Sequence, residues 1–144
     1  MISRRHAVAS LTLFAELLAS RVAGAEPQAA AAPQGVAPPP LFRHDLPNLT
    51  MEGWEVTVSH VDYAPGRVGA PHHHPGFVLA YVLEGAVIAK ISEQGPERTY
   101  TAGQMFYEQP GATHEVSKNA SQTQPARLLA MIFAKKGSVL TTPA

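Results

Sequence analysis

The 144-residue chain contains no cysteine and is poor in charged residues. The absence of cysteine excludes disulfides, cysteine-ligated zinc, iron–sulfur clusters and a cysteine nucleophile. Charged residues make up only 15% of the sequence, and its 11 basic side chains balance its 11 acidic ones. Because the formal net charge is zero, no electrostatic attraction favours a nucleic acid, and we expect no nucleic-acid partner.

Several catalytic signatures are missing as well. The glycines at positions 85, 95 and 103 stand alone in turn-like contexts, so no phosphate-binding loop is present. No serine lies in a nucleophile-elbow context, and no closely paired carboxylates indicate a glycosidase. After residue 40 no segment has the apolar periodicity of a helix, which leaves strands as the expected elements.

The first 25 residues have the features of an export signal. Arg4 and Arg5 are basic, residues 7–18 are mostly apolar, and Ala23-Gly24-Ala25 forms a small-x-small cleavage site. The apolar stretch is short and is interrupted by Glu16, so it is poorly suited to span a bilayer. After removal of the signal we expect no stable membrane insertion. An ordinary amphipathic or disordered N-terminus is the alternative. We expect an exported, periplasmic protein that uses the general secretory route or, given the adjacent arginines, the twin-arginine route.

The remainder divides into a linker, one β-domain and a tail. Residues 26–45 are rich in Ala and Pro and are predicted to be a disordered linker. Residues 46–136 are predicted to form a barrel or sandwich, and residues 137–144 a C-terminal tail. Because this core is modest in size, we expect a homodimer. Short β-type segments separated by Gly/Pro turns occur at 54–59, 77–83, 86–92, 98–101, 105–108, 115–118 and 126–134.

Three consecutive histidines, His72, His73 and His74, are the main candidates for chemistry. In extended backbone, His72 and His74 point to one face and His73 to the other. His114 lies in a similar turn-flanked β context and is the predicted third ligand. Three imidazoles suit Fe, Mn, Ni, Cu or Zn and leave coordination positions open. The alternative is a surface histidine tract that binds metal only adventitiously.

The spacing around these histidines resembles two motifs of the cupin superfamily, and the chain is similar to its small single-domain bacterial members. The first motif is matched by Gly66, five residues, His72-His73-His74, ten residues and Gly85. The second is matched by the run from Gly103 through Pro110-Gly111 to His114. The resemblance implies a conical antiparallel β-barrel of the jelly-roll type, called a double-stranded β-helix, with a metal near its centre and often a homodimeric assembly.

One ligand of the cupin motif is missing from this sequence. The motif's glutamate falls at Val78 or, by the looser spacing, at Leu79, and neither side chain binds metal. The remaining three histidines resemble the centre of cupin-type dioxygenases that hold Fe(II) with histidine alone. They equally fit a cupin that binds metal weakly or not at all.

Glu108 is the candidate catalytic residue, since alternation places it on the same face as Phe106. If that face is interior, Glu108 can ligate metal or act as a base; otherwise it is a solvated residue at a sheet edge, the interpretation we favour. His60 falls in the same alternating register as Trp54, Val56 and Val58, so it is expected to share their face and to be a core or pocket residue. The cavity is predicted to be lined by Val78, Ala80, Val82, Phe106 and Met131.

These features predict one of two functions. The first is a metal-dependent dioxygenase or related oxidoreductase that acts on a small organic molecule, because an open metal site lies among apolar walls. The second is a non-catalytic exported protein that captures a small ligand or a metal, which the missing glutamate favours. The fold does not decide between them, because one fold hosts many functions.

Overall fold

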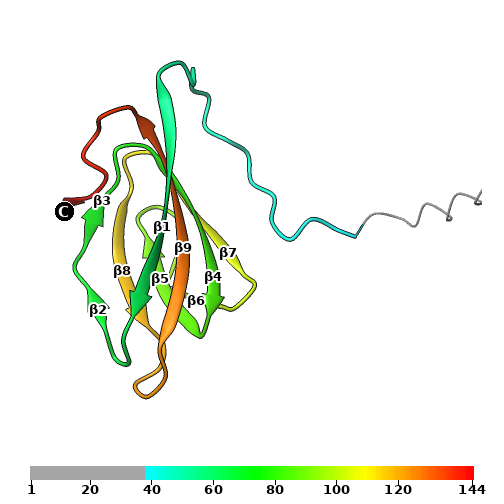
Figure 1. Ribbon diagram of the computed structural model, residues 1–144, viewed down its shortest axis with the longest axis vertical. Coiled ribbons are helices and arrows are strands. Elements are labelled where there is room, and N and C mark those ends of the chain that lie inside the picture. The colour runs from blue at the N-terminus through cyan, green and yellow to red at the C-terminus, as the bar shows by residue number, and fades with distance from the viewer. Residues whose placement is uncertain (1–37) are drawn as a thin grey trace, which may run out of the picture. The chain divides into compact units, whose positions relative to one another are not determined.

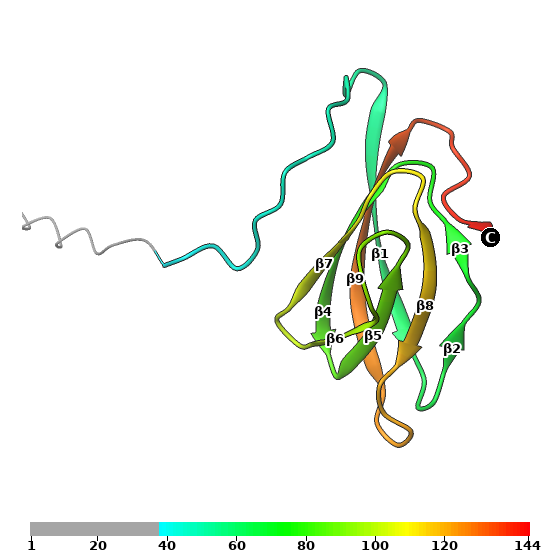
Figure 2. The same cartoon turned by 180° about the vertical axis from the view of Figure 1, so that it is seen from behind.

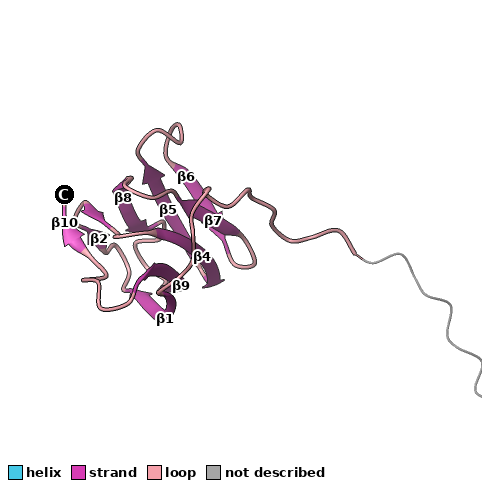
Figure 3. Cartoon of the chain, turned by 90° about the horizontal axis from the view of Figure 1, so that it is seen from above, coloured by secondary structure: helices cyan, strands magenta, loops and turns pink. Residues whose placement is uncertain are grey.

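The computed structural model describes residues 38–144, so the predicted export signal and much of the predicted linker lie outside the described residues. Within residues 38–144 all regular elements are β-strands (Figure 3), and none is a helix able to span a membrane. The all-β fold class is therefore confirmed. The strands are β1 (Trp54–Tyr63), β2 (Val68–Gly69), β3 (His72–His73), β4 (Phe77–Glu84), β5 (Ala86–Ile91), β6 (Arg98–Thr101), β7 (Met105–Glu108), β8 (Thr113–Asn119), β9 (Ala126–Lys135) and β10 (Thr142–Pro143).

Two antiparallel sheets form the domain, as the front and back views show (Figures 1 and 2). One sheet has the strand order β1-β9-β4-β7, and the other has the order β10-β3-β8-β5-β6, with β2 also paired to β8. Each predicted strand corresponds to one of these elements, and β6 and β7 have the predicted bounds. The two-residue strands β2, β3 and β10 were not predicted, because so short a segment carries no periodicity.

The inner face of β1 is the opposite of the one expected. Tyr63 is buried and lines the cavity together with Val61 and Ser59, whereas Val56 and Val58 lie on the other face and are 49% and 53% exposed. His60 is also exposed, so its predicted place in the core or pocket is wrong. Apolar residues occupy both faces of β1, and alternation alone did not identify the inner one.

The last residues of the chain belong to the barrel. The segment predicted as a tail contains β10, in which Thr142 pairs with His73 and Pro143 with His72. The Ala144 N–H also donates to the Pro71 carbonyl at 3.2 Å. The C-terminal segment therefore adds a strand beside the histidine run.

Two positions fix the ends of neighbouring strands. The buried Asn119 side chain donates from Nδ2 to the Tyr63 carbonyl at 3.1 Å and the Gln124 carbonyl at 2.8 Å. This amide therefore ties the ends of β1 and β8 together. At Gly76, a Cβ atom would lie 1.9 Å from the Phe133 carbonyl oxygen, so only glycine fits where β4 begins beside β9.

Candidate metal centre

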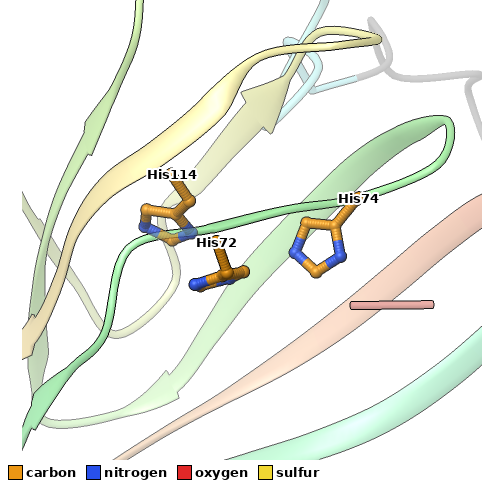
Figure 4. Close-up of side chains that lie close together, drawn as sticks. All are labelled: His72, His74 and His114. Carbon is orange, nitrogen blue, oxygen red and sulfur yellow. The ribbon is translucent and has the colours of Figure 1, made fainter. Parts of the chain in front are cut away.

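The structure brings the three predicted histidines together. His72 on β3 and His114 on β8 are direct partners in the antiparallel register, and His74 follows two residues after His72. Figure 4 shows the three side chains gathered on one side of their strands. One nitrogen of each ring lies within 4.8 Å of the others. The expected shared face of His72 and His74 is thus present.

Hydrogen bonds set the tautomers of His72 and His74. His72 Nδ1 lies 2.9 Å from the Ala70 carbonyl oxygen, and His74 Nδ1 lies 2.7 Å from the Leu140 carbonyl oxygen. A carbonyl oxygen only accepts hydrogen bonds, so each Nδ1 carries the hydrogen. In the neutral ring Nε2 then has a free lone pair, which is the form that binds a metal.

The corresponding nitrogen of His114 lies beside the carboxylate of Glu108. Its Oε1 lies 3.1 Å from His114 Nδ1, and its Oε2 lies 3.8 Å from His74 Nε2. His114 Nε2 is buried and has no hydrogen-bond partner among the described residues. A buried nitrogen without a partner is costly, and a metal ion would satisfy it. All three rings therefore present Nε2 as the free ligand atom.

Glu108 lies in the interior, with only 5% of its surface exposed. The favoured interpretation of this residue as a solvated edge carboxylate is therefore wrong. It is wrong because Glu108 is on the inner face of β7, where the other sheet and the histidines cover it. Tyr107, the residue before it, points away and packs against the rings of Phe77 and His44.

A carboxylate from the neighbouring strand lies beside the histidines, although the glutamate of the first motif is missing. Val78 on β4 and Glu108 on β7 are direct partners in the register. Opposed residues on one face of an antiparallel pair have Cβ atoms about 5 Å apart. Glu108 therefore places a carboxylate beside the histidines from the strand opposite Val78, whose own side chain carries no charge.

The donor set fits a divalent transition metal. Three imidazole nitrogens with an adjoining carboxylate suit the metals predicted from sequence. Burial lowers the pKa of His72, and the neighbouring His114 and His74 lower it further, which favours the neutral ring. His73 lies outside this group, and its Nδ1 is 3.2 Å from the Ala112 carbonyl oxygen.

A cavity of about 430 Å³ extends from the histidines into the barrel. Val78, Ala80 and Phe106 line it as predicted. Val82 is fully buried but does not reach the cavity, and the prediction for Met131 is wrong. The inward residues of β9 are Leu128, Ala130 and Ile132, so Met131 lies on the opposite face of the strand.

The cavity also has polar residues that the sequence reasoning missed. Tyr63, Arg67 and Ser117 line it, and the Tyr63 hydroxyl lies 2.7 Å from Ser117 Oγ. The Arg67 guanidinium lies over the Tyr63 ring, with Cζ 5.3 Å from its centroid. Burial raises the pKa of Tyr63 above its ordinary value of 10.0, so its hydroxyl stays protonated at neutral pH.

A β-bulge lets His114 and Ser117 face the same cavity. In the pairing of β5 with β8, Ile91 lies opposite His114 and Lys90 opposite Val116, which leaves Glu115 as an extra residue on β8. A bulge of this kind reverses the alternation of side chains beyond it. Without it, residues an odd number apart would point to opposite faces of the strand.

Comparison with known families agrees with this architecture. A family model for the cupin domain matches residues 59–132, which contain all three histidines and Glu108. No curated protein matches the chain by sequence.

Solved structures share the fold at low sequence identity. The DMSP lyase DddQ from Ruegeria pomeroyi gives a TM-score of 0.53 at 17% identity, over 62% of this chain and 43% of that one. An oxalate decarboxylase from Lactobacillus farciminis gives 0.53 at 17%, over 61% of this chain and 26% of that one. A double-stranded β-helix protein from Klebsiella pneumoniae gives 0.50 at 21%, over 67% and 79%. The chain thus spans less than half of the two enzymes, and these likenesses establish the fold alone.

Proposed function

This chain belongs to the cupin family, and from that premise we propose that it is an exported metal-dependent enzyme acting on a small organic molecule. The metal is a divalent transition ion, one of Fe, Mn, Ni, Cu or Zn, held by His72, His74 and His114. Oxidation of dioxygenase type is the proposed reaction class.

One observation carries the proposal: each of the three rings has an oxygen acceptor beside Nδ1, which leaves Nε2 free to bind a metal. Acceptors at Ala70, Leu140 and Glu108 hold the rings in that tautomer. Outer partners of this kind orient histidine ligands and raise their basicity. The convergence of these three rings beside a buried carboxylate separates them from His73, whose Nδ1 also lies near a carbonyl oxygen.

The side chains around the cavity have separate proposed roles. A bound metal would supply Lewis acidity and, if iron or copper, redox chemistry. Oε1 of Glu108 lies 3.1 Å from His114 Nδ1 and favours the tautomer with a hydrogen there, whereas Oε2 is the atom that would accept a proton from a ligand in the cavity. The walls formed by Val78, Ala80 and Phe106 exclude water from that ligand.

Metal analysis of untagged protein tests the proposal. After reconstitution with each candidate metal we expect about one ion per chain, lost in His72→Ala, His74→Ala and His114→Ala. His73→Ala is the matched control, because His73 is adjacent in sequence but lies outside the group. Less than about 0.2 ion per chain after every reconstitution would refute metal binding.

An oxygen-uptake screen with small organic molecules separates the enzyme from a binding protein. Oxygen consumption that disappears in His74→Ala supports the enzyme. Saturable ligand binding with no turnover of any kind would instead establish a non-catalytic cupin.

We also propose a homodimer that buries the outer face of the sheet containing β1. Val56 and Val58 are exposed there, and their register partners Phe133 and Met131 continue the apolar surface across β9. An exposed apolar face of this kind favours association. Sedimentation should give a dimer that Val58→Asp dissociates, whereas Val139→Asp, exposed elsewhere, does not. A monomeric wild-type protein would refute it.

Export is proposed from the sequence alone. The basic pair Arg4-Arg5, the apolar stretch and the Ala23-Gly24-Ala25 site support it. Expression of the full chain in a bacterium, followed by fractionation, should give a periplasmic protein with Glu26 as its first residue. Recovery of uncleaved protein from the cytoplasm would contradict the proposal.

A further inference from the structure

Arg67 lines the cavity, and no carboxylate in residues 38–144 pairs with it. Its guanidinium lies over the Tyr63 ring and donates to the carbonyl oxygen of Asp62. The Asp62 carboxylate itself pairs with Arg127, 2.5 Å from its Nε. Among the described residues no carboxylate forms a salt bridge with Arg67, although the residue lines the cavity. Most of its five N–H donors therefore remain available.

Beside Arg67, the hydroxyl groups of Tyr63 and Ser117 have one hydrogen that the bond between them does not use. Tyr63 and Ser117 are both buried, and each hydroxyl has one O–H to donate. Their mutual hydrogen bond of 2.7 Å uses one of the two hydrogens, whichever residue donates. The other has no acceptor among the described residues, and both side chains line the cavity. A buried donor of this kind favours a ligand that brings an acceptor.

We propose that Arg67, Tyr63 and Ser117 form an anion-binding end of the cavity that takes the carboxylate of a small organic acid. The rest of that acid lies along the apolar walls and reaches toward the three histidines. The proposal deepens the proposed function, on which it rests, because it names the ligand class for the same cavity.

The chemistry of this end favours a carboxylate over a phosphate. The planar guanidinium can donate to both oxygens of one carboxylate. The hydroxyl hydrogen that the bond between Tyr63 and Ser117 leaves unused adds one further donor. A phosphate dianion has more acceptor oxygens than these groups satisfy. The remaining walls, including Val61, Leu128 and Ala130, are apolar and suit the hydrocarbon part of the acid.

Calorimetric titration with acetate, butanoate and hexanoate tests the inference, with butanamide as the neutral isostere and inorganic phosphate as the alternative anion. Both metal-free and metal-loaded protein are titrated. We expect butanoate to bind at least tenfold more tightly than butanamide or phosphate. Arg67→Gln should remove that preference, and Ser117→Ala should weaken butanoate about threefold to tenfold. Arg98→Gln, on β6 and away from the cavity, is the matched control.

The outcomes separate this inference from the proposed function. Metal content is measured in Arg67→Gln alongside binding and should equal that of the wild type. If metal binds but butanoate shows no preference over butanamide, or binds equally in Arg67→Gln, the carboxylate end is refuted. Absence of butanoate binding at millimolar concentration refutes it too. If metal does not bind but metal-free protein still selects butanoate through Arg67, only the proposed function fails.

Discussion

Replacement of Glu108 by glutamine removes a buried charge and keeps the shape of the side chain. The carboxylate Oε1 lies 3.1 Å from His114 Nδ1, and the Glu108 side chain is 7% exposed. A hydrogen bond to a charged group contributes about 1.5–3 kcal/mol. In the variant the amide oxygen still accepts from Nδ1, but the amide hydrogens then face His74 Nε2, which lies 3.8 Å from the present Oε2. The substitution therefore weakens two metal ligands.

We expect the metal affinity of Glu108→Gln to fall about 10- to 100-fold, the usual cost of losing an outer partner of a histidine ligand. Competition for Zn(II) or Co(II) against a chromophoric chelator measures it. Glu115→Gln is the matched control, because that carboxylate pairs with Lys90 away from the cavity. An affinity within about twofold of the wild type would refute the assigned role of Glu108.

A second variant tests the geometry of this argument. Because Val78 lies directly opposite Glu108, a carboxylate placed at Val78 reaches the same region. Val78→Glu combined with Glu108→Gln should recover much of the lost affinity. In the wild-type background Val78→Glu brings two carboxylates together and should destabilise the metal-free protein. Failure of the double variant to gain affinity over Glu108→Gln would show that the two positions do not serve one site.

Four further outcomes are expected. Asn119→Ala leaves buried carbonyls without a donor and should lower the free energy of unfolding by about 3 kcal/mol in urea. Gly76→Ala should lower it by more than about 2 kcal/mol, since its Cβ would meet the Phe133 carbonyl. A chain ending at Lys136 loses the Leu140 acceptor, so its metal affinity should fall about tenfold by chelator competition. Because the pKa of His72 in the folded protein is below its ordinary value of 6.5, the metal-free protein should lose stability as the pH falls from 6.5 through the folded pKa. Urea unfolding midpoints measured across this range should show the loss, and His72→Gln should reduce it.

The strands and the histidines were predictable from the sequence because both depend on local pattern. The turns around Gly85 and Pro110-Gly111 limit short β-type runs, and extended backbone gives His72 and His74 a common face. The partnership of His72 with His114 followed from the motif spacing. These properties need no knowledge of which strands are neighbours.

The features that were missed all depend on register or on a bulge. The placement of Glu108 opposite Val78 becomes visible only when β4 and β7 are paired. Ser117 shares the cavity with His114 only because Glu115 is an extra residue on β8. Val56 and Val58 indicated the wrong inner face for β1, because the outer face of a strand can also be apolar.

The bond between His74 and Leu140 has a consequence for the order of events during synthesis. The two residues are 66 positions apart, and the acceptor lies in the last few residues of the sequence. During translation His72 and His74 leave the ribosome well before the segment that fixes the His74 ring. His74 therefore gains this acceptor only after that segment has docked, and we expect metal loading to follow that step. A ribosome-bound chain that stops before Leu140 would carry all three histidines and still hold metal poorly.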